Sequence, residues 1–443
     1  MRSRHRSKFV AATLTVAVGL FTAGPAATAQ ARGVSTAPPA TDPPPTGDQA
    51  DDHDPATDEE TEATEHGEAP SGAAEAQSAM PRLAVADAES GTVELLDLVE
   101  GTVIDTFEAT GPSFLATDGR IVFAIDYEGG VVTAIDTGTW VVDHGDHYHA
   151  YVSEPAVIGT REGEHPAHVV SNDDYTSIFF DGTGTADMID EESLESGRVE
   201  PSFTIEAAGP HHGLVVAFAD HFAVSIPGAT PEDLPIGLEV RHDDGEVEGS
   251  FEDCPEMHGE ASFSTGVLMA CQDGLMWLTG SEGAWDAAKL PYPDGTPDGD
   301  RTWSLAHVPG VPAVAGLLGE NAVVVVDTET AETRRVELPE AGVAVAVADG
   351  GDHVLGLTAD GQLHLIDAAT GTIETSGPVV DPIDLDATDG PPSPAVVVSG
   401  PRAYVSDPAT SSIHEVDFAD GMRIARSFEL GVVPAELALT GSR

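Results

Sequence analysis

Basic residues and long apolar segments are scarce in this sequence. Only 18 of the 443 residues are Lys or Arg, whereas 77 are Asp or Glu, which gives a formal net charge of −59. A field this negative repels nucleic acid and anionic membranes and attracts cations. The same excess is typical of proteins adapted to salt or selected for solubility. No segment is long enough to cross a membrane as a helix, so we expect neither membrane insertion nor a nucleic-acid partner.

The one apolar stretch near the N-terminus lies in a setting typical of a secretory signal peptide. Basic residues precede the stretch at positions 9–21, and Ala27, Ala29 and Ala31 supply the small residues of a cleavage region. We therefore predict a signal peptide over residues 1–31. The mature protein is then exported, to the periplasm, the cell surface or the medium.

Residues 32–81 are rich in Pro, Thr, Ala, Asp and Glu and show no apolar periodicity. Such a segment cannot bury enough apolar surface to fold, so we predict a disordered acidic arm. It carries His53 and His66, each beside carboxylates, which makes weak and labile metal capture conceivable in an otherwise solvated linker. Residues 82–443 are long enough for a substantial core.

Cysteine is also scarce, with only Cys254 and Cys271 in the whole chain. In an exported protein, two cysteines this close together favour a disulfide over a metal-binding pair. The bridge would hold the loop that carries His258. A catalytic thiol is the alternative.

Convincing amphipathic helices are missing after residue 82, where short apolar strands alternate with Gly, Asp and Pro turns. The segments 120–139, 322–338 and 362–377 each show an alternating strand, a turn with Asp and Thr, and a second strand. This unit recurs every roughly 40–50 residues, which is typical of a β-propeller with four-stranded blades. We therefore predict an all-β fold.

The blade count follows from the innermost strands. They are predicted to begin near Phe114, His168, His212, His258, His307, Ala344, Val396 and Glu436. The C-terminal end supplies one inner strand without its outer strands, and the residues after 82 supply outer strands without an inner one. Together they predict a closing blade built from both ends of the chain. The count is eight, and seven is the alternative because residues 180–250 are irregular.

One histidine recurs at the predicted start of the innermost strand in four successive repeats. These residues are His168, His212, His258 and His307, and Glu436 is the equivalent residue of the closing blade. Residues at such positions ring the mouth of the central channel, and neutral imidazole is a preferred ligand of zinc. We therefore predict a zinc site at the channel mouth. Imidazoles bonded to backbone carbonyls in a polar channel are the alternative.

Flanking residues supply further candidates for that site. His165, His211 and Glu260 lie next to the four histidines and are predicted to act as alternate or supporting ligands. Glu260 could also serve as a base in a zinc hydrolase. The remaining histidines, His221, His242, His353, His364 and His414, have no clustered partners in the sequence and are assigned to turns and strand surfaces.

A second constellation lies in the segment DHGDHYHAY at 143–151. It holds His144, His147 and His149 beside two aspartates. If the segment is extended, His147 and His149 point to the same face, because side chains alternate along a strand. Two such imidazoles can bind one ion, either within the channel site or separately. An exposed polar loop is the alternative.

At the segments DHGDHYHAY and EHPAHV, the chain resembles the exported zinc metallochaperones encoded beside zinc-specific ABC importers. The resemblance covers most of residues 82–443. It implies a β-propeller that binds zinc with high affinity and passes it to the importer's zinc solute-binding protein, without being an enzyme. The family's His-rich N-terminal arm has only a thin counterpart here in His53 and His66. We expect such a protein to act as a monomer.

Two other functions stay open at this point. A secreted metal-dependent hydrolase or lyase on a propeller, such as a lactonase, is one, although such sites typically use carboxylates and Asn for calcium. A protein-interaction propeller with incidental histidines is the other. Nucleophile elbows, phosphate-binding glycine loops and the HExxH motif are all missing from the sequence.

Overall fold

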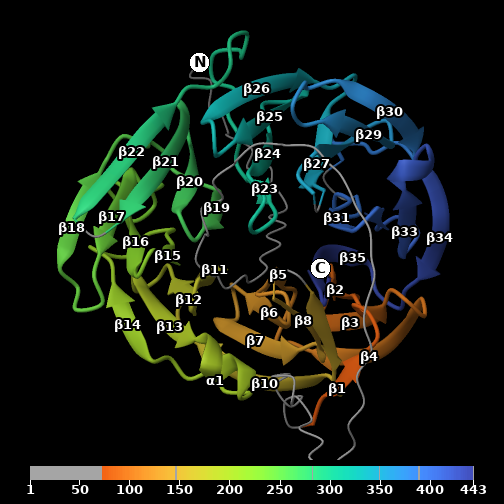
Figure 1. Cartoon of the computed structure of the whole chain (residues 1–443), viewed down its shortest axis with the longest axis horizontal. Coiled ribbons are helices and arrows are strands. Elements are labelled where there is room, and N and C mark those ends of the chain that lie inside the picture. Colours follow the sequence, from red (N-terminus) through yellow and green to blue (C-terminus); the bar gives the residue numbers. More distant parts are fainter. Residues whose placement is uncertain (1–71, 145–146, 282, 349, 388–389, 443) are drawn as a thin grey trace, which may run out of the picture.

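Antiparallel strands dominate the structure, a computed structural model that describes residues 72–144, 147–281, 283–348, 350–387 and 390–442. Within these ranges the strands form eight four-stranded sheets and one three-stranded sheet. Figure 1 shows the four-stranded sheets arranged as a ring around a common centre, each with one strand innermost and one at the rim. This all-β architecture is that of a β-propeller, as the sequence predicts.

The sheets follow one another along the chain, and within each sheet the strands run in order from the centre of the ring outward. The first three sheets comprise β5 (Phe114–Thr117), β6 (Ile121–Asp126), β7 (Val131–Asp136) and β10 (Ala156–Glu162); β11 (Pro166–Asn172), β12 (Tyr175–Phe180), β13 (Thr185–Asp190) and β14 (Phe203–Glu206); and β15 (Val215–Phe218), β16 (His221–Ile226), β17 (Gly237–Arg241) and β18 (Val247–Phe251). The next two comprise β19 (Glu260–Phe263), β20 (Gly266–Cys271), β21 (Gly274–Ser281) and β22 (Ala284–Leu290); and β23 (Ala306–His307), β24 (Ala313–Leu317), β25 (Ala322–Asp327) and β26 (Glu332–Glu337).

The last three four-stranded sheets complete the ring. They comprise β27 (Gly342–Val347), β28 (His353–Thr358), β29 (Gln362–Asp367) and β30 (Ile373–Pro378); β31 (Val396–Ser399), β32 (Arg402–Asp407), β33 (Ser412–Asp417) and β34 (Arg423–Glu429); and β35 (Pro434–Thr440), β2 (Arg82–Asp87), β3 (Thr92–Asp97) and β4 (Thr102–Glu108). In the last sheet β35 pairs antiparallel with β2, from Arg82 opposite Thr440 to Asp87 opposite Pro434. Strands from the two ends of the described chain therefore share one sheet.

The recurring Asp–Thr turns have a local physical cause. In the β25–β26 hairpin, the Asp327 carboxylate accepts hydrogen bonds from the backbone N–H groups of Glu329 and Thr330. Asp367 binds the backbone N–H of Thr370 in the β29–β30 hairpin in the same way. An Asp side chain that satisfies turn amides favours a tight reversal over a continued strand. The motif thus ends one strand and begins the next.

The core lies between neighbouring sheets. Strand β6 is buried at every position, whereas the outermost strand β4 is mostly exposed. One apolar cluster joins Phe123 of β6 to Ile178 of the next sheet, and another joins Phe218 of β15 to Met269 of β20. Because each sheet is covered on both faces, its middle strands read as continuous apolar runs and not as strict alternation.

The three-stranded sheet is an addition to this ring. It consists of β8 (Thr139–Asp143) and β9 (Tyr148–Val152), inserted between β7 and β10, and of β1 (Ala74–Ala76), which pairs with β9. Residues 74–76 therefore form a strand, although the sequence predicts disorder up to residue 81. The sequence Ala-Glu-Ala is too short to show a strand pattern. These residues become a strand because they pair with the edge of β9. The signal-peptide prediction and most of the acidic arm, with His53 and His66, lie outside the described residues.

Two short helices interrupt the strands in the described part of the chain. Helix α1 (Glu191–Glu195) begins after Asp190, whose side chain accepts a hydrogen bond from the backbone N–H of Ser193. The 3-10 helix η1 (Phe418–Asp420) follows β33. Among the described residues, no helix is long and apolar enough to cross a membrane.

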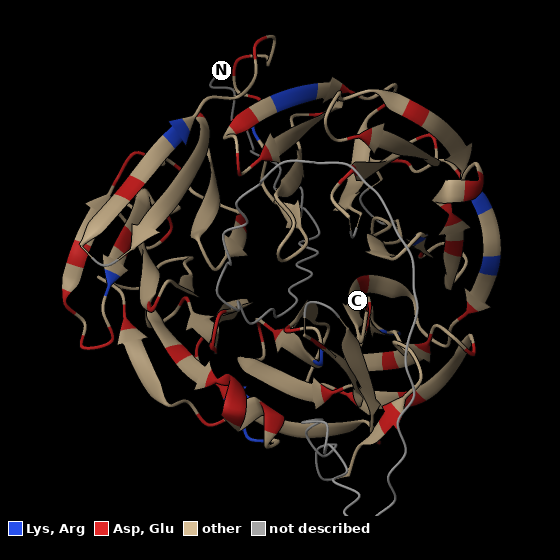
Figure 2. Ribbon diagram, viewed as in Figure 1, with Lys and Arg blue, Asp and Glu red and all other residues tan. Residues whose placement is uncertain are grey.

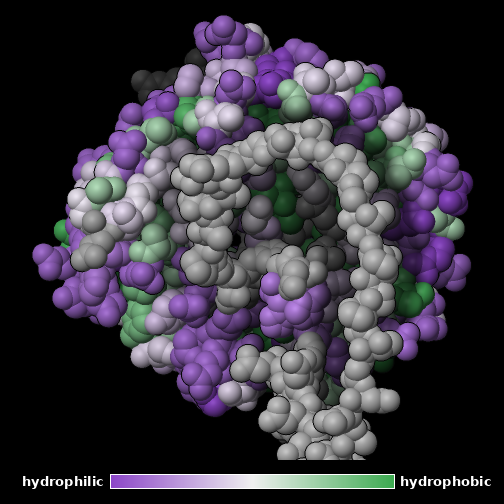
Figure 3. All heavy atoms as spheres, in the orientation of Figure 1, coloured by the Kyte–Doolittle hydropathy of each residue, from purple (hydrophilic) through white to green (hydrophobic). Residues whose placement is uncertain are grey.

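Strand direction defines two faces of the ring. Innermost strands begin on the face that we call the channel-mouth face, and they end on the opposite face. Because the pairing is antiparallel, the first hairpin of each sheet and the end of its third strand lie on the opposite face. Acidic residues occur on strands all round the ring, and basic residues mark only a few positions (Figure 2). On the face drawn in Figure 3, hydrophilic residues predominate along the rim.

Candidate metal centre

Three imidazoles from three successive sheets meet on the channel-mouth face. His168 is the third residue of β11, His212 lies in the loop that leads into β15, and His258 lies in the loop that leads into β19. One ligand atom from each lies within 4.8 Å of the other two. The ring centroids of His212 and His258 are 5.3 Å apart and stacked, and those of His168 and His212 are 4.8 Å apart. We call this group the channel-mouth cluster.

Hydrogen-bond partners determine which nitrogen of each ring faces the others. His212 donates from Nδ1 to the Asp181 carboxylate at 2.7 Å, and His258 donates from Nδ1 to the carbonyl oxygen of Trp303 at 2.7 Å. The Nδ1 of His168 lies 3.7 Å from Glu260 Oε1. His212 and His258 therefore carry a proton on Nδ1 and direct Nε2 toward the other rings, which is the arrangement of metal-binding histidines. The Nδ1 of His168 makes no hydrogen bond and faces Glu260 at ion-pair distance only.

The spacing of the lone pairs fits one tetrahedral ion. The Nε2 atoms of His168 and His212 are 3.1 Å apart. With Zn–N bonds of about 2.0 Å, two ligand nitrogens of one tetrahedral zinc ion lie about 3.3 Å apart. Two neutral imidazoles whose lone pairs face each other at this distance repel each other unless a proton or a metal ion lies between them. The residues present therefore fit zinc.

Burial and the nearby carboxylate set the protonation of the cluster. Burial lowers the pKa of His168, but the Glu260 carboxylate outweighs this effect, so that the pKa is raised overall. Burial, together with the neighbouring His168, lowers the pKa of His258 to about 4. For Glu260, burial raises the pKa, but the surrounding imidazoles more than offset it and the net pKa is lowered. A carboxylate with a lowered pKa thus lies beside the imidazoles, and its negative charge favours a divalent cation bound among them.

Two further residues predicted for this site, His307 and Glu436, are not members of the group of three, although His307 interacts electrostatically with Glu260. His307, the last residue of β23, packs against Phe263 with ring centroids 5.4 Å apart, and burial lowers its pKa to about 4. No described ligand atom of His307 takes part in the group of three. Glu436, on β35, is buried with Oε2 unbonded, and burial raises its pKa to about 8. No charged group of the cluster perturbs Glu436.

The two flanking histidines have other partners. The ring of His165 stacks on Tyr127, with centroids 4.8 Å apart. His211 is fully enclosed, with Nδ1 2.8 Å from the carbonyl of Gly209 and Nε2 2.7 Å from the Ser225 hydroxyl. Both nitrogens of His211 are therefore used within the fold, and burial lowers its pKa. The structure thus brings neither residue to the three Nε2 atoms.

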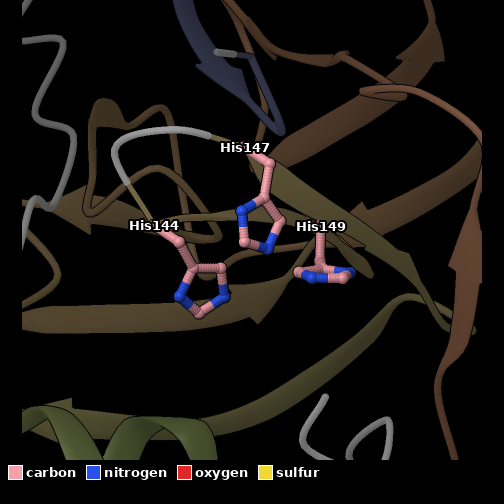
Figure 4. A group of neighbouring side chains, drawn as sticks. All are labelled: His144, His147 and His149. Carbon is pink, nitrogen blue, oxygen red and sulfur yellow. The ribbon is translucent and has the colours of Figure 1, made fainter. Parts of the chain in front are cut away.

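A second histidine group lies at the tip of the β8–β9 hairpin (Figure 4). His144, His147 and His149 offer ligand atoms within 4.8 Å of one another, and their ring centroids are 5.0–5.3 Å apart. His149 Nδ1 lies 2.6 Å from the Glu75 carboxylate of the neighbouring chain segment. Because β7 ends on the opposite face, this hairpin group does not join the channel-mouth cluster.

Cys254 and Cys271 form a disulfide, as the sequence predicts. Both cysteines are buried, and the bridge ties the loop before β19 to the end of β20. The amide of His258 also donates to the carbonyl of Ala270, next to Cys271. The loop that carries His258 is therefore held at two points.

Three residues that complete these groups are not predicted by the sequence. Asp181 follows β12 in an ordinary turn segment, Trp303 contributes only its backbone carbonyl, and Glu75 lies in the segment predicted to be disordered. The only sequence signal for Asp181 is its place at a hairpin on the channel-mouth face, one sheet before His212. The carbonyl of Trp303 has no sequence signal, because every residue carries one.

Comparisons with known proteins agree with this architecture. No family model matches the chain. The chain is 30% identical over 344 residues to the zinc chaperone AztD of Citrobacter koseri, covering 76% of this chain and 81% of that protein. The crystal structure of Citrobacter koseri AztD superposes with a TM-score of 0.75 at 28% identity, over 82% of this chain and 98% of that one. Its apo structure has the same score and identity.

A more distant structure, the dihydro-heme d1 dehydrogenase NirN, has a TM-score of 0.52 at 16% identity over 80% of this chain and 74% of its own, which shows likeness of fold alone. The similarity to AztD is much stronger, because it combines higher sequence identity with coverage of nearly the whole described ring. It also favours zinc handling over a hydrolase or an interaction propeller. This chain belongs to the AztD family of zinc chaperones, which are not enzymes.

Proposed function

We propose that the protein is an exported chaperone that captures zinc at the channel-mouth cluster and passes it to the solute-binding protein of a zinc ABC importer. The observation that carries the proposal is the convergence of three imidazoles from three sheets, two of which, His212 and His258, are oriented by a hydrogen-bond acceptor at Nδ1. The membership of the chain in a zinc chaperone family supports zinc as the cargo. Its predicted signal peptide supports export to the periplasm or the cell surface.

The cluster offers a way to release zinc without protein unfolding. The side chain of His212 is 35% exposed, whereas that of His168 is 6% exposed. A ligand from a partner protein can therefore displace His212 first, while His168 still holds the ion from below. Because the three ligands come from three different sheets, a partner can replace them one at a time while the ring keeps its shape. His307 and Glu436 play no part in this exchange.

The hairpin group is proposed to be a second, more exposed zinc site. His144 and His147 are exposed, and the adjoining strand β1 leads directly to the acidic arm. An exposed site binds and releases ions quickly, which suits capture from solution. We place the arm histidines, His53 and His66, in the same role.

The eight four-stranded sheets are interpreted as eight blades of one ring, closed by β35 and β2 in a shared blade. Such closure removes exposed sheet edges and makes the ring rigid. A rigid ring keeps His168, His212 and His258 in place when zinc leaves. We propose that the protein acts as a monomer toward its partner.

Zinc content tests the binding step. The purified protein is dialysed against zinc and then against buffer at pH 7.5, and its zinc is measured by elemental analysis. We expect His168→Ala and His212→Ala each to lose about one zinc per chain, because each removes one of the three ligands. The matched control is His353→Ala, which removes an imidazole that faces a single carboxylate, Glu374. Unchanged zinc in both ligand variants, with normal circular dichroism, would overturn the channel-mouth assignment.

A transfer assay tests the chaperone step. Zinc-loaded protein is mixed either with a zinc-free solute-binding protein of an ABC importer or with a chelator of equal affinity. We expect faster transfer to the solute-binding protein than to the chelator, because a docked partner displaces His212 directly. Equal rates would mean that zinc simply dissociates, and the proposed handover would then be wrong.

A further inference from the structure

A third histidine group lies on the face of the ring opposite the channel-mouth cluster. It is formed by one sheet: His221 opens β16 at the first hairpin, His242 follows the end of β17, and Glu248 lies on β18. Trp285, from β22 of the next sheet, packs on His221 with ring centroids 4.8 Å apart. The sequence places both histidines on turns and strand surfaces without clustered partners, and the structure brings them together.

The key residue of this group is His221, which is only 3% exposed. Its Nδ1 lies 3.1 Å from the carbonyl oxygen of Ala219, an acceptor, so Nδ1 carries the proton. Its Nε2 is buried and makes no hydrogen bond. The nearest acceptor, Glu248 Oε2, lies 3.2 Å from Nε2 but outside hydrogen-bonding geometry. A buried imidazole nitrogen thus faces a carboxylate oxygen at ion-pair distance, without a well-formed hydrogen bond between them.

Nε2 of His221 is buried and has no hydrogen-bond partner, so this nitrogen is left to be satisfied by a proton or by a metal ion. A metal ion bound by both atoms satisfies Nε2 and uses the charge of Glu248. Two ligand atoms of one tetrahedral zinc ion lie about 3.3 Å apart, close to the 3.2 Å between Nε2 and Oε2. The same Oε2 accepts a hydrogen bond from Trp285 Nε1 at 2.8 Å, which holds the carboxylate toward His221.

His242 supplies a second imidazole at a suitable distance. Its ring centroid lies 5.3 Å from that of His221, with the rings nearly perpendicular. Two imidazoles bound to one tetrahedral ion place their ring centroids roughly 5 Å apart. Its Nδ1 is 2.5 Å from the Asp243 carboxylate, so Nε2 is again the free nitrogen. In the structure the ligand atoms of His242 lie together with those of Asp243 and Asp244, so the exposed His242 side chain has to turn toward His221 to share the ion.

We propose that His221, His242 and Glu248 bind a divalent transition-metal ion, with zinc as the expected occupant. The site has two imidazoles and one carboxylate, a donor set that zinc accepts, and Asp244 is the next carboxylate available. It would connect two hairpins of one sheet on the face opposite the channel-mouth cluster. The inference stands on its own and does not depend on zinc delivery to a partner.

The test uses a background variant of the full protein, His147→Ala/His149→Ala/His212→Ala, in which ligands of the other two groups are removed. After dialysis against zinc at pH 7.5, we expect the background to retain about one zinc per chain. Adding His242→Ala or Glu248→Gln should remove that zinc. Both residues are more accessible than His221, so these changes leave the core intact. Adding His353→Ala is the matched control and should change nothing.

Cobalt gives an independent readout. Co²⁺ bound by two imidazoles and a carboxylate in a tetrahedral site absorbs visible light, and we expect this absorption in the background variant and its loss with His242→Ala. The proposal is wrong if the background retains no metal, or if both additional substitutions leave its zinc unchanged. Loss of the channel-mouth zinc is scored separately, in the step from wild type to His212→Ala.

Discussion

Removal of the Asp181 carboxylate should weaken zinc binding although Asp181 is not proposed to touch the ion. Asp181 is 8% exposed and accepts from His212 Nδ1 at 2.7 Å. It thereby holds the proton on Nδ1 and directs Nε2 toward His168. Loss of such an orienting carboxylate typically costs 10–100-fold in metal affinity, or roughly 1.4–2.7 kcal/mol. That range agrees with the roughly 1.5–3 kcal/mol expected for a hydrogen bond to a charged group.

The experiment compares Asp181→Ala with Asp181→Asn by competition against a chromogenic zinc chelator at pH 7.5. The alanine variant should show the full loss, and the asparagine variant a smaller one, because its amide oxygen still accepts from Nδ1. Asp327→Ala is the matched control, since Asp327 occupies a similar hairpin turn but bonds only backbone amides. An unchanged zinc affinity in Asp181→Ala, with native circular dichroism, would refute the orientation of His212 by this carboxylate.

Two further predictions concern pH. Burial raises the folded-state pKa of Glu436 to about 8, above its unfolded value of 4.5, so its contribution to stability is fully present below pH 4.5 and is lost as pH rises through about 8. Relative to Glu436→Gln, the wild type should therefore lose up to about 5 kcal/mol of unfolding free energy between pH 4 and 9 in urea titrations, and parallel profiles would contradict the burial of an unpaired carboxyl. The second prediction concerns His168, whose pKa is raised by the nearby Glu260 against the effect of burial. Protons should begin to compete with zinc at His168 above pH 6.5, and Glu260→Gln should move the onset of zinc loss to lower pH. Chelator competitions from pH 5 to 8 that show the same onset in both proteins would exclude this role of Glu260.

Much of the fold could be predicted from the sequence because its causes are local. Short apolar strands that are separated by Asp–Thr turns are a short-range signal. In the structure the turn aspartates bind backbone amides of the same hairpin, as at Asp327 and Asp367. The close spacing of Cys254 and Cys271 predicted their disulfide. Strand Ala74–Ala76 could not be predicted, because its pairing depends on the edge of β9.

The candidate sites were less predictable. All five residues that recur at the predicted starts of inner strands were expected on one face of the ring. The sequence did not separate His168, His212 and His258 from His307 and Glu436. Sequence register determines the height of a residue along the ring axis and not the direction of its side chain. In the structure His307 packs against Phe263, and Glu436 is buried without a charged neighbour. The group around His221 has no sequence signal because its members come from three separate segments of one sheet.

The sequence by itself determined the alternation of strands and turns, the negative charge and the supply of histidines at the ends of strands. Only the tertiary structure decided which imidazoles share an ion. Metal binding depends on lone pairs that converge within a few ångströms, and that convergence is a property of neighbouring sheets and of buried acceptors such as Asp181 and the Trp303 carbonyl. Those acceptors select the free nitrogen of each ring, and they lie in other parts of the chain.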